Sequence, residues 1–181
     1  MSIRPARAED LPVMLEIYRP YVEETTTSFE YVTPSLEEFR ARFLEHTAQF
    51  PWLVWEEEGD VLGYAYAGLA YGRAAYLWCA EISIYFRKDA RGHGRGRQLL
   101  TSLENILTRQ GYRISYAIIT AENEASFRFH EAMGYRTVAE LPNCGYKMGR
   151  WLGIRYLQKD LNPLGAPEAF PVSWRELEGQ A

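Results

Sequence analysis

Apolar residues near the start of the chain first fit a strand and then recur at helical spacing. Residues 2–7 predict a short first strand. The segment Glu9-Asp10-Leu11-Pro12 combines acidic residues with an early proline, which is typical of the first turn of a helix. Apolar side chains then recur every three or four residues until a polar run, Thr25-Thr26-Thr27-Ser28, interrupts the pattern. We therefore expect a strand, a helix and then a break.

A second helix and a pair of strands are predicted next. Ser35-Leu36-Glu37-Glu38 fits a capping box at the start of a helix. Residues 51–57 and 61–71 are rich in aromatic and other apolar side chains, and Gly59-Asp60 between them is a turn signal. This pattern predicts an antiparallel hairpin.

The second half of the chain alternates strand and helix patterns. The expected elements are a strand at 75–86, a helix through 99–107 that ends near Gly111, a strand at 114–120, a helix at 123–133, and strands at 135–141 and 147–161. The order favours an α+β fold with a mixed, mostly antiparallel sheet flanked by helices. We expect a single domain at 1–161 and an irregular, proline-containing tail at 162–181.

Composition and charge exclude several classes of protein. The chain has 181 residues and a formal net charge of −4, which disfavours nucleic-acid and anionic-membrane partners. No apolar run approaches the roughly 18 residues that span a bilayer, and the first residues do not resemble a signal peptide. Cys79 and Cys144 are too few for a disulfide framework and lack metal-ligand spacing. We expect a cytoplasmic protein without a metal.

A basic, glycine-rich loop separates the strand at 75–86 from the following helix. It reads Arg91-Gly92-His93-Gly94-Arg95-Gly96-Arg97. Glycine lets the backbone approach a ligand closely, and a helix N-terminus attracts anions, so the pattern predicts a phosphate site. The alternative is a solvated basic turn. The loop is neither a P-loop nor a dinucleotide fingerprint, because no Gly-Lys-Ser/Thr ends it and Arg97 stands at the third glycine position.

Two blocks of sequence together resemble the GNAT acetyltransferase superfamily. Arg91-x-x-Gly94-x-Gly96 after a strand is similar to its acetyl-CoA loop. The superfamily's next helix usually reads Asn-x-x-Ala-x-x-x-Tyr-x-x-x-Gly-Phe, and the corresponding residues here are Asn123, Ser126, His130, Gly134 and Tyr135. The expected order of strands and helices agrees with the fold of that superfamily.

The resemblance extends to the phosphinothricin and methionine sulfoximine acetyltransferases over residues 2–161. Those enzymes share a histidine at position 130, where the wider superfamily has a tyrosine that is often assigned as the general acid, so the acid is left open. The other matching features are Thr27-Ser28-Phe29, Pro51-Trp52-Leu53-Val54, Arg73, Tyr76, Ala80-Glu81-Ile82-Ser83-Ile84-Tyr85, His130-Glu131 and Gly145-Tyr146-Lys147-x-Gly149-x-Trp151.

The resemblance implies transfer of acetyl from acetyl-CoA to the amine of a small, amino-acid-like substrate. An α-amine with a pKa of about 8 is largely protonated at neutral pH, so the reaction needs a base. Glu81 is our candidate, because it lies on the strand that leads into the loop; the alternative is a carboxylate that is paired within the strand. His130 is the candidate for assistance near the sulfur, and the alternative is a packing histidine.

The resemblance also assigns residues to the two substrates. The backbone of Ile84, Tyr85 and Phe86 would pair with the pantetheine arm. Asn123 would bond the same arm or the amide of the next strand, although asparagine is also a common helix cap. Ser126 is the next candidate for the cofactor. The amino-acid acceptor would be bound by Arg73 and Tyr76 on one side and by Lys147 and Trp151 on the other. The alternatives are surface ion pairs for Arg73 and Lys147, and core packing for Trp151.

Three rival functions remain open at this point. The acceptor amine could instead belong to a protein N-terminus, a polyamine or an aminoglycoside, although Arg73 favours an anionic amino acid. A non-catalytic acyl-CoA-binding module is a second possibility, which the presence of Glu81 disfavours. A nucleotide-binding oxidoreductase is the third, and the short chain disfavours it. Related enzymes are usually homodimers, so we expect a homodimer.

Overall fold

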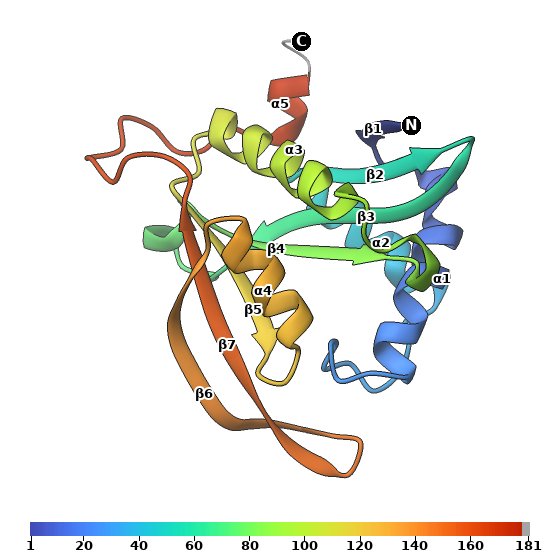
Figure 1. The fold of residues 1–181 in the computed structure, drawn as a ribbon. Helices are drawn as coiled ribbons and strands as arrows, with labels where there is room; N and C mark the ends of the chain where they lie inside the picture. Colours follow the sequence, from blue (N-terminus) through green and yellow to red (C-terminus); the bar gives the residue numbers. More distant parts are fainter. Residues whose placement is uncertain (179–181) are drawn as a thin grey trace.

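The computed structural model describes residues 1–178 and contains one seven-stranded sheet, in the order β1-β2-β3-β4-β5-β7-β6 (Figure 1). This arrangement confirms the predicted α+β class and the predicted order of elements. The strands are β1 (Ser2–Pro5), β2 (Trp52–Glu57), β3 (Asp60–Leu69), β4 (Cys79–Phe86), β5 (Ile114–Thr120), β6 (Arg136–Lys147) and β7 (Arg150–Asp160). The α-helices are α1 (Leu11–Glu23), α2 (Leu36–His46), α3 (Arg95–Gln110), α4 (Glu124–Ala132) and α5 (Trp174–Glu178).

The sheet consists of two antiparallel parts joined by one short parallel pairing. Strands β1 to β4 pair antiparallel, and so do β5, β7 and β6. Between the two parts, β4 and β5 share only the pairs Cys79↔Ile114, Ala80↔Ser115 and Glu81↔Tyr116. Both strands continue beyond these pairs without each other, so the sheet splits open after Glu81.

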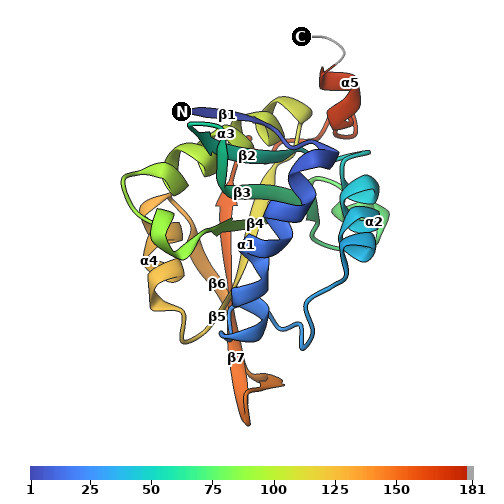
Figure 2. The same cartoon turned by 90° about the vertical axis from the view of Figure 1, so that its right-hand side faces the viewer.

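Helices cover both faces of the sheet, as Figure 2 shows, with α3 and α4 on one side and α1 and α2 on the other. The apolar stripe of α3 is fully buried at Leu99, Leu100, Leu103 and Leu107. On the other face, α1 and α2 pack against an aromatic cluster that includes Trp52, stacked on Tyr66 with ring centroids 4.2 Å apart. The side chains on the two faces of β4 therefore pack into two separate hydrophobic clusters.

Two strand boundaries differ most from the sequence prediction. Strand β4 begins at Cys79, because Ala74–Tyr76 form a 3₁₀ turn rather than extended chain. Strand β6 runs on to Lys147, with a shift of register between Leu141 and Gly145. Proline at position 142 has no N–H to donate to the ladder, which explains an irregularity at this point. Strands β6 and β7 thus form one long hairpin.

The C-terminal segment, predicted to be irregular, folds back onto the domain and ends in helix α5. The indole N–H of Trp78 donates to the carbonyl of Ala169 at 3.0 Å, and the Trp78 ring stacks on Phe170. The Gln110 amide donates to the carbonyl of Val172 at 2.8 Å. These contacts join the segment to the start of β4 and the end of α3. Residues 179–181 of the predicted tail lie outside the described residues.

The loop between α1 and α2 (the bridging loop) links helix α1, which packs on β3 and β4, to the other part of the sheet. The ammonium of Lys147, at the end of β6, donates to the carbonyls of Val22 at 2.6 Å, Thr25 at 2.8 Å and Ser28 at 2.6 Å. From the end of β5, the hydroxyl of Thr120 donates to the carbonyl of Thr26 at 2.7 Å. The threonine run that interrupted the helical pattern therefore belongs to a loop that is held by hydrogen bonds to the ends of β5 and β6.

Candidate active site

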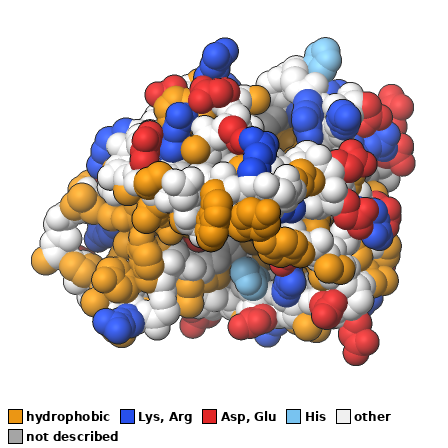
Figure 3. Space-filling model, turned by 90° about the horizontal axis from the view of Figure 1, so that it is seen from below, with side chains coloured by type: hydrophobic (Ala, Val, Ile, Leu, Met, Phe, Trp, Pro, Cys, Tyr) orange, Lys and Arg blue, Asp and Glu red, His pale blue; other side chains and the backbone are white. Residues whose placement is uncertain are grey.

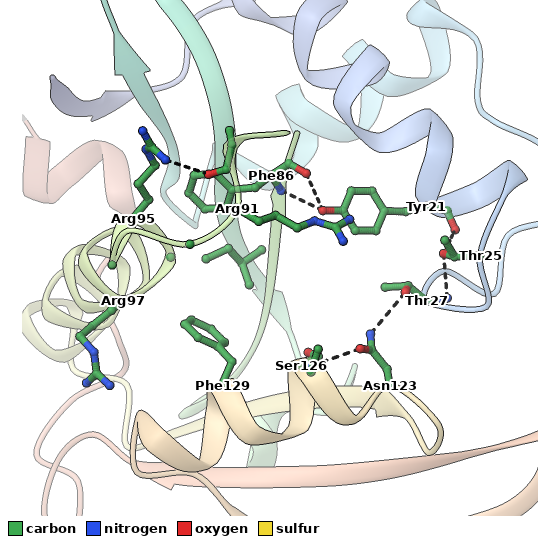
Figure 4. A pocket seen from close by; sticks show the side chains of 16 residues that line it. Tyr21, Thr25, Thr27, Phe86, Arg91, Arg95, Arg97, Asn123, Ser126 and Phe129 are labelled. Atoms are coloured by element: carbon green, nitrogen blue, oxygen red, sulfur yellow. Dashed lines mark hydrogen bonds between the residues drawn. The ribbon is translucent and has the colours of Figure 1, made fainter. Parts of the chain in front are cut away.

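A cavity of about 490 Å³ occupies the split between β4 and β5 (Figure 4). Its walls come from the end of β4, the loop that precedes α3, the first turns of α3 and α4, and the end of α1 with its following loop. The split supplies space here because no strand pairs with β4 beyond Glu81. The predicted site residues that line the cavity are Ile84, Phe86, Arg91, Gly92, Gly94, Arg95, Gly96, Arg97, Asn123 and Ser126.

The glycine-rich loop presents the N-terminus of α3 to this cavity. Gly92, His93 and Gly94 have φ values of 92°, 54° and 75°, all in the left-handed region. Gly94 is the N-cap of α3 and offers no side chain to satisfy the first N–H groups of the helix. These N–H groups and the positive end of the helix dipole form an anion site.

Of the three loop arginines that line the cavity, only Arg91 reaches across it, as Figure 4 shows. Its guanidinium lies 5.2 Å from the ring centroid of Tyr21. Arg95 turns away and forms a forked ion pair with Glu57, at 3.0 and 2.9 Å. Arg97 also points outward, toward the carbonyl of Ala132 at 3.4 Å. Arg95 and Arg97 therefore line the cavity mainly with their backbone.

Gly96 lies in close contact with α4 at the wall of the cavity. A Cβ built at Gly96 would lie 3.3 Å from Cε2 of Phe129, closer than ordinary van der Waals contact. A larger residue at this position would therefore require Phe129 to shift by a few tenths of an ångström.

The edge of β4 that faces the cavity carries peptide groups that no neighbouring strand pairs with. Phe86 lies opposite Gly63, but the ladder bond at this level runs from the N–H of Arg87 to the carbonyl of Leu62, at 2.9 Å. The N–H and C=O of Phe86 therefore point to the other edge, toward the split, and by alternation those of Ile84 do too. The peptide groups of Tyr85 point to β3, and its ring packs against Tyr21 on the opposite face of the sheet.

Glu81 lies at the apex of the split, as the last residue of β4 that pairs with β5. Its side chain shares a face with Ser83 and is half-buried, and it has no ion pair among residues 1–178. Burial raises the pKa of Glu81 above its ordinary value. Burial also raises the pKa of Tyr66, and the nearby charge of Glu81 adds to that rise. A half-buried carboxylate with a raised pKa is suited to accept a proton.

Asn123 caps helix α4 and also lines the cavity. Its side-chain oxygen accepts a hydrogen bond from the N–H of Ser126 at 3.2 Å, so it is the N-cap of α4. Its amide group donates to the hydroxyl of Thr27 at 3.3 Å, which joins α4 to the bridging loop. Because both Asn123 and Ser126 also line the cavity, capping does not exclude contact with a ligand.

His130 is buried behind Phe129 and is not one of the residues that line the cavity. Its Nδ1 lies 2.9 Å from the carbonyl of Ser126, which only accepts, so Nδ1 carries the proton. Burial lowers the pKa of His130, so the ring is mainly neutral and presents a lone pair at Nε2. This geometry weighs against direct proton donation by the ring, and the catalytic role of His130 stays a prediction.

The four residues expected to bind the acceptor lie at two ends of the sheet. Arg73 and Tyr76 are exposed beside the start of β4. Trp151 is exposed near the β6–β7 turn, separated from them by the length of β5, roughly 20 Å at 3.3 Å per residue. Lys147 is buried and uses its three N–H groups on backbone carbonyls. That geometry gives Lys147 a bracing role, and its contact with the acceptor stays a prediction.

Several cavity residues were not identified from the sequence. Tyr21, Thr25 and Thr27 come from the end of α1 and the bridging loop, and Phe129 comes from α4. The threonine run was visible as a break in periodicity, but nothing local indicated that it faces a cavity. Tyr21 fitted the buried stripe of a helix. Among residues 1–178 no cluster of histidine, cysteine or acidic side chains could hold a metal ion, and none of the helices could cross a bilayer.

Comparison with known proteins places this geometry in a family. Residues 3–153 match the model of the acetyltransferase (GNAT) domain. The chain is 35% identical over 167 residues to phosphinothricin N-acetyltransferase of Streptomyces viridochromogenes, covering 92% of this chain and 91% of that protein. It is 36% identical over 164 residues to the L-methionine sulfoximine/L-methionine sulfone acetyltransferase of Pseudomonas aeruginosa, covering 90% and 95%.

A solved structure agrees with these relatives. The GNAT superfamily phosphinothricin acetyltransferase of Sinorhizobium meliloti, in complex with acetyl-CoA, matches with a TM-score of 0.89 at 35% identity, covering 93% of this chain and 94% of that one. The split sheet, the glycine-capped helix and the matched sequence lead to one conclusion: this chain belongs to the GNAT family of acetyltransferases.

Proposed function

We propose that this protein transfers the acetyl group of acetyl-CoA to the α-amine of a small amino acid whose side chain carries an oxygen-rich tetrahedral centre. Phosphinothricin, methionine sulfoximine and methionine sulfone are acceptors of this kind. The observation that carries the proposal is the split between β4 and β5, which joins a cavity with an anion site to the half-buried Glu81 along one strand. The relatives named for these acceptors support it.

The cavity has the chemistry that acetyl-CoA requires. The N-terminus of α3 and the guanidinium of Arg91 suit phosphate groups. The open edge of β4 suits the amides of the pantetheine arm, which can pair with a strand as a peptide does. The apolar side chains of Ile84 and Phe129 suit the methylene groups of the arm.

The protein's part in the reaction is to orient the two substrates and to remove a proton. Bound acetyl-CoA supplies an activated acetyl group. Glu81 accepts a proton from the acceptor's ammonium, directly or through water, because an α-amine with a pKa of about 8 is mostly protonated at neutral pH. Arg73, exposed and without an ion pair among residues 1–178, is the proposed partner of the acceptor's carboxylate, with Tyr76 beside it.

We also propose a homodimer, in which the β6–β7 hairpin contacts a second copy. Strand β6 is an edge strand, and large apolar side chains are exposed on the hairpin at Tyr146, Met148 and Trp151. Figure 3, which views the molecule from the end where the hairpin projects, shows hydrophobic side chains gathered across this surface. The proposed compartment is the cytoplasm, where the free cysteines Cys79 and Cys144 would stay reduced.

The anion site can be tested with two glycine substitutions of the same kind. Gly94→Asp introduces a Cβ at a φ of 75° and a negative charge beside the proposed phosphates. We expect its affinity for acetyl-CoA, measured by calorimetry, to fall at least tenfold. Gly59→Asp, in the β2–β3 turn at a φ of 90° with open space around it, is the matched control and should bind normally. Unchanged affinity in a folded Gly94→Asp protein would remove the loop from the cofactor site.

The base can be tested with Glu81→Gln, which preserves shape and removes the charge. We expect turnover at neutral pH to fall by about 10²- to 10⁴-fold, the usual range for a general base. The raised pKa of Glu81 has a second consequence. Wild-type activity should fall as pH drops through that pKa, because a protonated carboxyl cannot accept a proton, and this dependence should disappear in the variant. Full activity of Glu81→Gln at neutral pH would exclude the assignment.

The acceptor class can be tested by comparing amino acids with their decarboxylated analogues in a thiol-release assay. Methionine sulfone should be acetylated efficiently and its decarboxylated analogue poorly, because the group that binds the carboxylate would be left unpaired. Arg73→Ala should raise KM for methionine sulfone more than it lowers kcat. Much faster turnover of putrescine or of an N-terminal peptide would show that the acceptor is wrong and leave the acetyltransferase assignment in place.

The dimer can be tested by sedimentation of wild type and two glutamate variants. Trp151→Glu should shift the protein toward monomer, because it places a charge in the proposed contact. Leu164→Glu, on the C-terminal segment, is the control, since Leu164 and Trp151 are both 63% exposed. A wild-type protein that sediments as a monomer at micromolar concentration would contradict the proposal.

A further inference from the structure

The open edge of β4 has a partner within the chain. Phe86, the last residue of the strand, directs its N–H and C=O into the split, where β5 no longer runs beside β4. Unpaired strand edges recruit other hydrogen-bonding groups. The hydroxyl of Tyr21, near the end of α1, donates to the carbonyl oxygen of Phe86 at 2.6 Å and accepts from its N–H at 3.0 Å.

One hydroxyl thus supplies the donor and the acceptor that a paired peptide group would supply. Figure 4 shows the Tyr21 ring entering the cavity from the α1 side, with both bonds to Phe86 and the Arg91 side chain alongside. The ring is held from two directions. It packs edge-on against Tyr85 at 4.9 Å, and the Arg91 guanidinium lies over it at 5.2 Å.

The same peptide groups are those that the pantetheine arm is proposed to use. A backbone N–H makes one strong hydrogen bond, so the N–H of Phe86 cannot bond to the Tyr21 hydroxyl and to a bound ligand together. We propose that the Tyr21 hydroxyl is a placeholder on the cofactor edge of β4, which the pantetheine arm of acetyl-CoA displaces when it pairs with Phe86. This inference rests on the proposed cofactor site. It goes beyond that site because it makes the Tyr21 hydroxyl a competitor of acetyl-CoA for the peptide group of Phe86.

The proposal has an unusual consequence for affinity. The two bonds to Phe86 stabilise the free protein and are lost in the complex, so the Tyr21 hydroxyl weakens the binding of acetyl-CoA. Removing the hydroxyl removes this competition. Because two hydrogen bonds to Phe86 no longer have to be broken, we expect at least roughly fivefold tighter binding in Tyr21→Phe. The ring, and with it the contacts to Tyr85 and Arg91, stays in place.

The experiment compares Tyr21→Phe with wild type and with Tyr18→Phe by calorimetry. Tyr18 lies one turn earlier on α1, and its hydroxyl bonds to Ser28 at 2.7 Å rather than to β4, so it controls for loss of a tyrosine hydroxyl from the same helix. Two ligands are titrated into each protein: acetyl-CoA, and 3′-phosphoadenosine 5′-diphosphate, which has the phosphates of the cofactor but no pantetheine arm.

The expected result is tighter binding of acetyl-CoA by Tyr21→Phe alone, with affinity for the arm-free nucleotide equal in all three proteins. Equal nucleotide affinity also shows that the variant keeps a folded anion site. Unchanged or weaker binding of acetyl-CoA by Tyr21→Phe would overturn the inference, and so would an equal gain for the arm-free nucleotide. Failure of acetyl-CoA to bind wild type would instead overturn the proposed cofactor site.

Discussion

The early end of the pairing between β4 and β5 is the constraint on which the rest of the structure depends. Two parallel strands that meet for only three residue pairs leave a strand edge that no other strand pairs with and a space beside it. On one face of the sheet, Phe129 of α4 lies against Gly96 at the start of α3, and both residues line that space. The cavity is therefore a product of the fold.

The alternation of side chains along β4 places Glu81 and the arginine-rich loop on opposite faces of the sheet. Successive side chains point to opposite faces, so Ile84 lines the cavity beneath α3 and α4, whereas Glu81 points to the face covered by α1 and α2. The arginine-rich loop stays on the cavity side, and the carboxylate remains without a cation beside it among residues 1–178. Burial can then raise the pKa of Glu81, because no nearby positive charge opposes the effect.

The loop between α1 and α2 connects the elements on both sides of the split by hydrogen bonds. Lys147 brings a buried ammonium from the β6–β7 hairpin to three carbonyls of this loop and the end of α1. A buried lysine is tolerated here because each of its hydrogens has an acceptor, and because cations are favoured near the C-terminus of a helix. The same loop reaches α4 through Thr27 and Asn123. It therefore connects both sides of the cavity without adding a strand.

The sequence by itself determined the order of the strands and of helices α1 to α4, together with the local chemistry. The capping box at Ser35 formed as predicted, with the Glu38 N–H donating to the Ser35 hydroxyl, and the glycine-rich loop preceded a helix. Such features depend on residues a few positions apart, which share a turn or a face whatever the rest of the chain does. Tertiary structure alone decided three interactions: the ion pair of Arg95 with Glu57, the hydrogen bonds of Lys147 to loop carbonyls, and the hydrogen bond of the Tyr21 hydroxyl to the peptide group of Phe86. Those partners lie 38, 122 and 65 positions apart, so they meet only after strand register and helix packing have been set.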